Sequence, residues 1–322
     1  MNTGFEHRAV MLREAVDALN VGPGGRIVDA TFGRGGHARA VLDRLGPDGM
    51  LVAIDRDPQA TAAARALAAQ DARVCVHERP FDAIREIVEA IVPGGRVDGV
   101  LMDLGVSSPQ LDDPQRGFSF QHDGPLDMRM GVGAPISAAA WIEKTSVAEM
   151  TRVFRELGEE RYAGRIARAI EQARAEAPIT TTGQLAAIVA AAHPSWERDR
   201  HPATRVFLAI RLHVNDELGQ VRRGLSAAVD VLAEGGRLVV ISFHSLEDRI
   251  VKRFMRDEER GDPVLRGLPI IGDPSGARLR RLGKAVRPSA AEVQGNPRCR
   301  SATLRVAQRL IREAAPAVGR SS

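Results

Sequence analysis

The first hundred residues alternate between short apolar runs, typical of buried strands, and segments with helical periodicity. The predicted strands are residues 26–31, 50–55, 73–77 and 97–103. The helical segments that lie before and between them are residues 10–19, 37–45, 58–69 and 82–91. Strands that are buried on both faces read as continuous apolar runs, and parallel strands need a crossover helix between them. The pattern therefore predicts an α/β protein with a doubly wound, parallel sheet.

The pattern changes after residue 107. Residues 107–130 are rich in Gly, Pro and Asp and predict an ordered loop, and residues 138–192 carry only helical signals, strongest at 147–157, 159–176 and 184–192. A further helix is predicted at 204–223, and strand patterns return at 237–243 and 301–309. We therefore expect one α/β domain with an inserted all-helical domain. The expected division is residues 1–110 (first part), 111–225 (loop plus helical insertion for substrate recognition), 226–312 (second part, with a basic C-terminal region) and 313–322 (disordered tail).

Composition narrows the class of protein. A chain of 322 residues can bury two sizeable cores without metal or disulfide staples. The two cysteines, Cys75 and Cys299, form no CxxC motif, so we expect neither a metal site nor a disulfide framework. Aromatic residues make up only 4% of the chain, which argues against an aromatic platform for RNA bases. No run of 18 apolar residues and no leader pattern are present, so we expect a cytoplasmic protein without a membrane segment.

Charge is distributed unevenly along the chain. The net charge is +4, but residues 278–312 contain ten Lys or Arg and a single acid, Glu292. The rest of the chain is therefore mildly acidic. A basic region on an acidic body is expected of a protein that binds a phosphate backbone, and a solvated basic tail is the alternative.

A Gly-rich turn lies between the first predicted strand and its helix, in the segment DATFGRGGH at residues 29–37. Gly33, Gly35 and Ala38 satisfy the dinucleotide pattern G-x-G-x-x-G/A, in which the backbone can approach a ligand closely. Asp55 ends the next strand, where a carboxylate can accept both ribose hydroxyls. Together these features predict a ligand that contains adenosine, and a plain turn with a capping acid is the alternative.

A second acid, Asp103, ends the fourth predicted strand and is followed by the turn Ser107-Ser108-Pro109-Gln110. Acids at such strand ends face the ligand crevice. Asp103 and the backbone carbonyls at 107–109 are hydrogen-bond acceptors that could orient an exocyclic amine toward an electrophilic methyl group. Such in-line transfer depends mainly on positioning. The turn therefore favours S-adenosylmethionine over a nicotinamide cofactor, and a loop-capping role for Asp103 is the alternative.

Two more segments are candidates for function. Residues 116–130 combine Phe118 and Phe120 with turn residues, which is typical of a lid or base-holding loop but also of a packed Ω-loop. Residues 241–249 predict a strand that leads into a helix. There Ser245 and Asp248 have the spacing of a capping box, and His244 is a further catalytic candidate.

Long segments of the chain resemble the RsmH (MraW) family of bacterial small-subunit ribosomal RNA methyltransferases. The resemblance covers the chain from near its N-terminus to about residue 306, and only the Gly-rich turn would be a weak signal alone. The matching segments are residues 7–19, 29–37, 53–58, 103–113, 116–130, 240–249 and 296–301.

The resemblance implies methyl transfer from S-adenosylmethionine to the exocyclic N4 amine of a cytidine in 16S rRNA, near the decoding centre. It also implies a Rossmann-like, class I methyltransferase sheet and an assembled small ribosomal subunit as substrate. Phe81 follows the third predicted strand, where its ring would flank the adenine. Carried over by position, the cofactor contacts fall on Gly35, Gly36, His37, Asp55, Phe81, Asp103 and Gln110; the glycine pattern adds Gly33.

One departure concerns the target base. Many amino-methyltransferases carry Asp/Asn-Pro-Pro-Tyr/Phe at this strand end, whereas here the turn runs from Asp103 to Pro109 without the aromatic residue. Phe118, Phe120 and His244 are our candidates for holding the cytosine. Two alternative functions stay open at this point: an NAD(P)-dependent oxidoreductase, and a non-catalytic RNA-binding assembly factor. The residues also leave a homodimer open.

Overall fold

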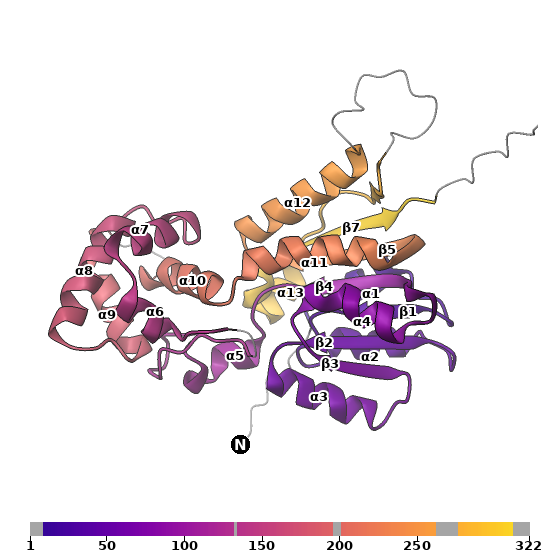
Figure 1. The fold of residues 1–322 in the computed structure, drawn as a ribbon, viewed down its shortest axis with the longest axis horizontal. Coiled ribbons are helices and arrows are strands. Elements are labelled where there is room, and N and C mark those ends of the chain that lie inside the picture. The colour runs from indigo at the N-terminus through magenta and orange to yellow at the C-terminus, as the bar shows by residue number, and fades with distance from the viewer. Residues whose placement is uncertain (1–8, 132–133, 196–200, 262–275, 312–322) are drawn as a thin grey trace, which may run out of the picture.

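The computed structural model describes residues 9–131, 134–195, 201–261 and 276–311. A sheet with helices on both faces forms one lobe, and a group of helices forms a second lobe beside it (Figure 1). The predicted tail at 313–322 lies outside the described residues. No helix in these four ranges is both long and apolar enough to cross a bilayer.

Seven strands form one sheet in the order β3-β2-β1-β4-β5-β7-β6. Strands β1 to β5 pair in parallel, and β7 is antiparallel to both β5 and β6. The predicted α/β sheet is therefore confirmed. The strands are β1 (Arg26–Asp29), β2 (Met50–Asp55), β3 (Val74–Glu78), β4 (Val97–Asp103), β5 (Leu232–Ser242), β6 (Leu279–Arg281) and β7 (Thr303–Arg309).

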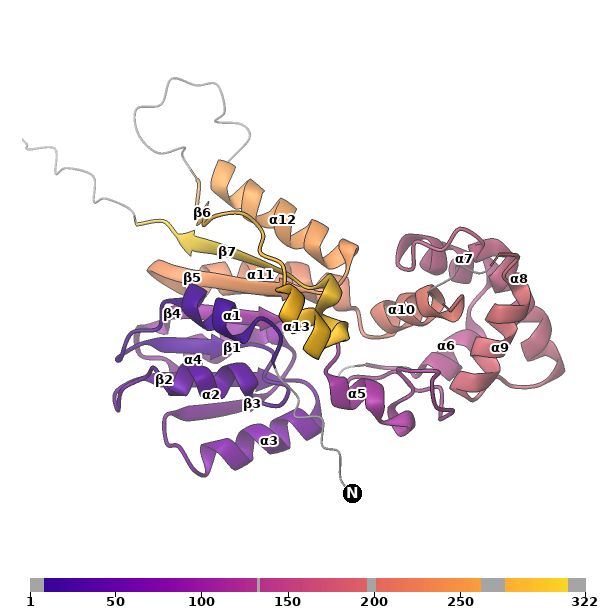
Figure 2. The same cartoon turned by 180° about the vertical axis from the view of Figure 1, so that it is seen from behind.

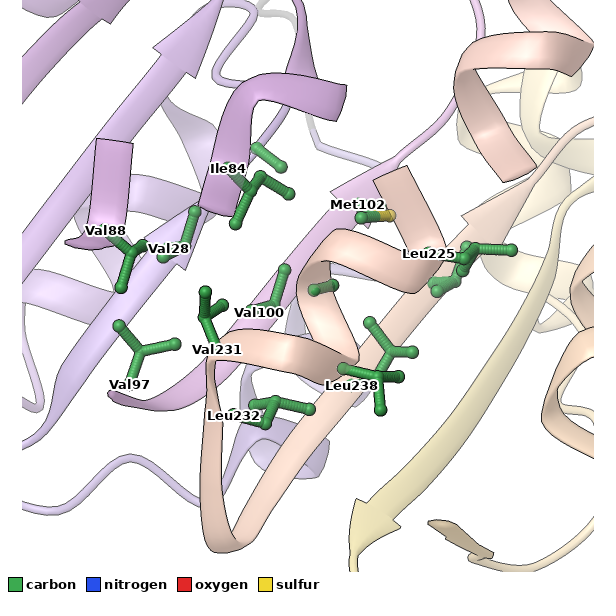
Figure 3. Close-up of a cluster of buried hydrophobic side chains, with 14 of the residues drawn as sticks. Val28, Ile84, Val88, Val97, Val100, Met102, Leu225, Val231, Leu232 and Leu238 are labelled. Atoms are coloured by element: carbon green, nitrogen blue, oxygen red, sulfur yellow. The ribbon is translucent and has the colours of Figure 1, made fainter. Parts of the chain in front are cut away.

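Helices cover both faces of the sheet, because the side chains of each strand alternate between two cores. Val100 and Met102 point into one core, whereas Leu101 between them belongs to the other. Figure 3 shows the first core, where Leu225 and Ile84 pack on strand residues. The helices on that face are α4 (Ile84–Ile91), α11 (Glu217–Val231) and α12 (Ser245–Arg260); those on the other face are α1 (Leu12–Leu19), α2 (Gly36–Leu42) and α3 (Pro58–Ala68).

The helical lobe has a core of its own, built around Trp141, Phe154 and Phe207. The preceding loop joins this core through Phe118 and Met128, which are both buried. Apolar residues at helical spacing thus produce a second, separate apolar centre, and the predicted helical insertion is confirmed. Its helices are α6 (Ala138–Lys144), α7 (Val147–Glu156), α8 (Ala163–Glu176), α9 (Thr182–Ala192) and α10 (Ala203–Val214).

The single helix predicted at 204–223 is wrong, because the chain breaks between α10 and α11. Asp216 takes a left-handed backbone conformation with φ 47°. The side-chain amide of Asn215 donates to the carbonyl of Arg211 in the last turn of α10. Beyond the break, α11 packs on α4 and on η1 (Phe81–Ala83), which belong to the sheet lobe. This packing favours a border near residue 215 for the insertion rather than 225, and the division into domains stays a prediction.

Two short elements differ from expectation. The predicted loop at 107–130 contains the helix α5 (Ser108–Asp112) and the 3-10 turn η3 (Pro114–Arg116). The edge strand β6 has no counterpart among the predicted strands, because only Leu279 of its three residues is buried and no alternation can be read from it. Two other short elements, α13 (Ala290–Gly295) and η5 (Pro297–Ser301), precede β7.

Candidate active site

A cavity of about 600 Å³ lies at the carboxyl ends of the parallel strands. Its walls come from both lobes: the β1–α2 turn, the ends of β2 and β4, α5 and the loop after it, α10, and the start of α11. Among the helices of the second lobe, α10 lies nearest to the sheet (Figures 1 and 2). The cavity therefore has a sheet side and a helical side.

Most of the predicted site residues line this cavity. Gly35 and Pro109 do not: they belong to the turns that shape its wall rather than to the wall itself. The predicted residues that do line it are Gly33, Gly36, His37, Asp55, Phe81, Asp103, Ser108, Gln110, Phe118, Phe120 and His244.

The Gly-rich turn is held to the end of β2 by Asp55. Its Oδ2 accepts the Gly33 N–H at 2.8 Å, and its Oδ1 accepts the Asp57 N–H at 2.9 Å. Each carboxylate oxygen can still accept a second hydrogen bond, so Asp55 is positioned for a diol. Burial raises the pKa of Asp55, and the hydrogen bonds from these two amides oppose that rise only in part.

Two glycines of the turn are required by close packing. Gly35 has φ 74°, and a Cβ there would lie 2.6 Å from the Phe32 ring. At Gly36 a Cβ would lie 2.7 Å from the Cβ of Ala9. Gly33 also has a positive φ, but little surrounds it, so it leaves room beside the cavity.

Asp103 presents an unused acceptor at the end of β4. Its backbone N–H donates to Thr31 Oγ1 at 2.6 Å, and its Oδ2 lies 3.8 Å from Nδ1 of His37. Its Oδ1 is buried and has no hydrogen-bond partner among the described residues. Burial, reinforced by the charges of Asp29 and Glu247, raises the pKa of Asp103 well above its usual range.

Asp29 opens the Gly-rich segment and acts on the site through its charge, which was not predicted. Its side chain is buried; Oδ1 accepts the Thr31 N–H at 3.2 Å, and Oδ2 has no partner among the described residues. Burial raises the pKa of Asp29 to about 7, although the Thr31 amide opposes the shift. The ends of the paired strands β1 and β4 therefore each carry an acid, Asp29 and Asp103.

Gln110 fastens α5 to the sheet lobe. Its Oε1 accepts the Ser107 N–H at 2.8 Å, and its Nε2 donates to Asp57 Oδ2 at 2.6 Å. Arg116 pairs with the same Asp57 oxygen at 2.9 Å. Gln110 thus holds the cavity wall in place, and its role as a cofactor contact stays a prediction.

Two carbonyls of the Ser107–Pro109 turn already accept hydrogen bonds within α5, and the role of this turn in positioning an amine stays a prediction. Ser107 caps α5, and its carbonyl accepts the N–H groups of Gln110 and Leu111. The carbonyl of Pro109 accepts the Asp113 N–H. These two acceptors serve the short helix, whereas Oδ1 of Asp103 has no partner among the described residues and can meet an amine at this strand end.

His244, not Ser245, caps α12. Its side chain accepts the Glu247 N–H, and Glu247 Oε2 in return accepts the Phe243 N–H at 2.9 Å. The predicted capping pair of Ser245 and Asp248 is therefore wrong. Ser245 instead hydrogen-bonds Glu159, and Asp248 pairs with Arg305 at 2.7 Å.

Glu247 lies beneath this cap with its side chain 1% exposed. Its Oε1 is 3.1 Å from Nε2 of His244. Burial raises the pKa of Glu247, but His244, Arg211 and the Phe243 amide outweigh that effect and lower it overall. The cavity floor thus contains a buried carboxylate in addition to Asp103.

The aromatic candidates lie in different places. Phe81 lies beside α11, where a Cβ on Gly224 would come within 2.5 Å of its ring. Phe118 is buried in the helical core, with the Arg116 guanidinium 5.7 Å from its ring centroid. Phe120 is partly exposed, and its ring lies 4.7 Å from that of His201 and 4.9 Å from that of Phe207.

A second group missed by the sequence analysis joins the two lobes. Arg56 is buried after β2 and donates to the Asn215 carbonyl at 3.2 Å and to Gln220 at 3.1 Å. The Asn215 side chain donates to the Met128 carbonyl at 2.7 Å and accepts the Met130 N–H at 2.9 Å. Asn215 therefore holds the loop after α5 against the break between α10 and α11, which is the hinge between the two lobes.

Many basic residues near the C-terminus have acidic partners. The structure contains ion pairs for four of the arginines between residues 278 and 309, which reduces the charge that is free to meet a phosphate. The pairs are Arg278 with Glu258 and Asp230, Arg281 with Glu259, Arg298 with Asp112, and Arg305 with Asp248. In the parts of the chain that the structure covers, no group of three or more His, Cys, Asp or Glu is placed to hold a metal ion.

Residues 4–310 match the model of the MraW methylase family. The chain belongs to the MraW methylase family. A relative from Thioalkalivibrio sulfidiphilus, the ribosomal RNA small subunit methyltransferase H, is 54% identical over 305 residues, which covers 94% of this chain and 97% of that protein. The resemblance inferred from the sequence is thus confirmed, and the oxidoreductase alternative is set aside.

Two solved structures are also similar to this methylase. An rRNA methylase from Streptococcus thermophilus has a TM-score of 0.42 and 10% identity, and covers 93% of this chain and 94% of its own. TrmN from Thermus thermophilus has a TM-score of 0.42 and 12% identity, and covers 93% of this chain and 48% of its own. Family membership rests on the sequence matches alone.

Proposed function

We propose that this methylase transfers a methyl group from S-adenosylmethionine to the exocyclic N4 amine of a cytidine in 16S rRNA, near the decoding centre of the small ribosomal subunit. One observation carries the proposal: a single cavity joins the Asp55-anchored Gly-rich turn to Asp103, whose Oδ1 is an unused acceptor. The name of the 54% identical relative supports the choice of small-subunit rRNA.

The residues on the sheet side fit S-adenosylmethionine. Asp55 would accept the ribose hydroxyls, and Phe81 would flank the adenine ring. The open space at Gly33 lets the ligand approach the backbone. When bound, the cofactor supplies an electrophilic methyl group on a sulfonium centre.

Asp103 then orients the amine. Its Oδ1 accepts one N–H of the exocyclic group, which turns the nitrogen lone pair toward the methyl donor. The positive charge of a bound sulfonium would favour the carboxylate form of Asp103 and offset its raised pKa. After the methyl group has moved, the nitrogen carries an extra proton, and Asp103 is placed to receive it. Positioning contributes most of the rate in this arrangement.

The helical lobe and the C-terminal region would contact the RNA. Lys284 and Arg300 have no acidic partner among the described residues and can meet phosphates. The target base must leave its stack to enter the cavity, at a cost of a few kcal/mol. We place this reaction in the cytoplasm, and a homodimer stays a prediction.

The test uses tritiated S-adenosylmethionine and small subunits from a strain that lacks the methylase, followed by nuclease digestion and nucleoside chromatography. Label in N4-methylcytidine is the expected result. Label in another nucleoside would overturn the cytosine assignment but keep methyl transfer. Cofactor binding without any transfer to subunits or to free 16S rRNA would favour the assembly-factor alternative.

A further inference from the structure

One stripe of α10 lines the helical side of the cavity. Thr204, Phe207, Leu208 and Arg211 all line the cavity, and their spacing of three, four and seven residues puts them on one face of the helix. The cofactor residues Gly33, Asp55 and Phe81 lie on the sheet side. The α10 stripe therefore lies on a side of the cavity to which no cofactor contact is assigned.

Arg211 is the charged member of this stripe. Its guanidinium makes two hydrogen bonds to Glu217, from Nε at 2.8 Å and from Nη2 at 3.0 Å. Its side chain is 13% exposed, and the third nitrogen, Nη1, has no hydrogen bond to any residue that the structure describes. A planar cation held in this way by a buried acid is pre-organised to donate to a further acceptor.

Arg211 and Asp103 face the same buried acid. The charge of Glu247 helps to raise the pKa of Asp103, and Arg211 helps to lower the pKa of Glu247. All three residues line the one cavity. The cavity wall thus carries an acceptor, Asp103, and a donor, Arg211, that both interact electrostatically with Glu247.

This arrangement matches the edge of a cytosine. That edge carries an amine donor at N4, next to acceptors at N3 and O2, whereas uracil carries an acceptor at position 4 and a donor at N3. We propose that Arg211 is a specificity-determining residue that donates from its guanidinium to N3 and O2 of the target cytosine while Asp103 accepts from N4. Phe207, one turn earlier on α10, borders the base. The inference rests on the proposed function and adds the residue that selects the base.

The test is a double-mutant cycle in which one change is made in the protein and the other in an atom of the target base. Small subunits are reconstituted with cytidine, 3-deazacytidine or 2-thiocytidine at the methylated position, which alters N3 and O2 in turn. Each substrate is offered to the wild-type enzyme and to Arg211→Lys. Lysine keeps a positive charge beside Glu217 but lacks the parallel N–H donors of the guanidinium. A double variant, Arg211→Met with Glu217→Gln, removes the ion pair without leaving the Glu217 carboxylate unpaired.

We expect the wild-type enzyme to lose roughly tenfold or more in kcat/KM on at least one analogue, as for one hydrogen bond to a charged group. Both Arg211 variants should lose a similar factor on cytidine and should no longer distinguish that analogue from cytidine. Arg85→Met, which removes an exposed ion pair with Glu89 on α4, is the matched control and should behave like the wild type.

The inference would be overturned if the loss from the Arg211 variant and the loss from the base analogue multiplied, because Arg211 would then act elsewhere, for example on a phosphate. Equal activity of the wild-type enzyme on all three bases would overturn it as well. Calorimetric binding of S-adenosylhomocysteine shows that each variant is folded, and the double variant carries the cycle if Arg211→Lys is unstable. Failure of the proposed function is distinguishable, because the wild-type enzyme would then not methylate the cytidine subunits at all.

Discussion

The N–H of Gly33 and the carboxylate of Asp55 are joined by a hydrogen bond of 2.8 Å that links two strand ends. This bond joins the Gly-rich turn and Asp55, which would hold the ribose, into a single unit. A ligand that contacts one of them therefore meets the other at a fixed distance.

Replacing Asp55 with Ala should weaken S-adenosylhomocysteine binding by about 2–4 kcal/mol, because two ribose hydrogen bonds are lost and two amides lose their acceptor. Isothermal titration calorimetry measures the change. Asp48→Ala, in an exposed turn, is the control and should bind as the wild type does. Unchanged affinity in Asp55→Ala would remove Asp55 from the cofactor site.

Replacing Asp103 with Asn should abolish most of the methyl transfer. The side chain keeps its shape, but it loses the carboxylate that orients the amine and accepts its proton. We expect a loss of about a hundredfold or more in kcat, as for other positioned proton acceptors, with subunit binding retained. Single-turnover methylation and a subunit pull-down measure the two properties. Full activity in Asp103→Asn would refute the role given to this residue.

Asp29 should make stability depend on pH. The folded protein holds the Asp29 proton up to a pKa of about 7, whereas the unfolded chain releases it near 3.8. Since the folded state binds more protons in this window, the free energy of unfolding falls as the pH rises from about 4 to 7, and changes no further above it. The decrease due to this group is about 4 kcal/mol at most.

Asp29→Asn removes this titration. Urea unfolding between pH 4 and 8 should give a flatter profile for Asp29→Asn than for the wild type, and greater relative stability above pH 7. Asp48→Asn serves as the control, since that side chain is exposed. If the two variants show the same pH profile as the wild type, Asp29 does not carry a raised pKa.

Asn215→Ala should loosen the hinge between the lobes. The change leaves the Met130 amide and the Met128 carbonyl without their partner, and we expect a loss of about 2–4 kcal/mol in stability. Methylation should fall further than cofactor affinity, because Arg211 and the loop after α5 lose their common support. Calorimetry and kinetics test both effects, with the exposed Gln70→Ala as control. Equal losses in affinity and rate would contradict this role.

His244 can be tested by its cap alone. Asn is a good helix N-cap, so His244→Asn should keep the cap and methylation and lose only the contact of Nε2 with Glu247, whereas His244→Ala should also lose about 0.5–2 kcal/mol of stability from the cap. Thermal unfolding and methylation at a permissive temperature measure the two. A large loss of rate in a stable His244→Asn variant would instead make His244 a catalytic residue.

The sequence predicted the sheet side of the site well, because strand ends can be read from local patterns. Strands β2 and β4 begin and end where their apolar runs do, and Asp55 and Asp103 are their last residues. Parallel topology then brings such residues to one edge. The family resemblance added Phe81 and Gln110, for which no local pattern exists.

The helical side could not be predicted in the same way. Asn215 is the clearest case, since its partners Met130 and Arg56 lie 85 and 159 residues away in the chain. The periodicity of α10 and α11 continues through it, so only the tertiary hydrogen bonds reveal the break. The cap of α12 was missed for a related reason, because His244 is not among the usual N-cap residues and Ser245 beside it is.

The neighbours β4 and β5 are far apart in the chain, and this order has a consequence for synthesis. Strand β4 ends at Asp103, and its partner β5 begins only at Leu232, after the whole helical lobe. On the ribosome, the first four strands emerge with the apolar edge of β4 unpaired, while the helical lobe, rich in local contacts, can already form. An open edge of this kind invites pairing with other chains. The nascent chain is thus exposed to aggregation from the emergence of β4 until β5 docks.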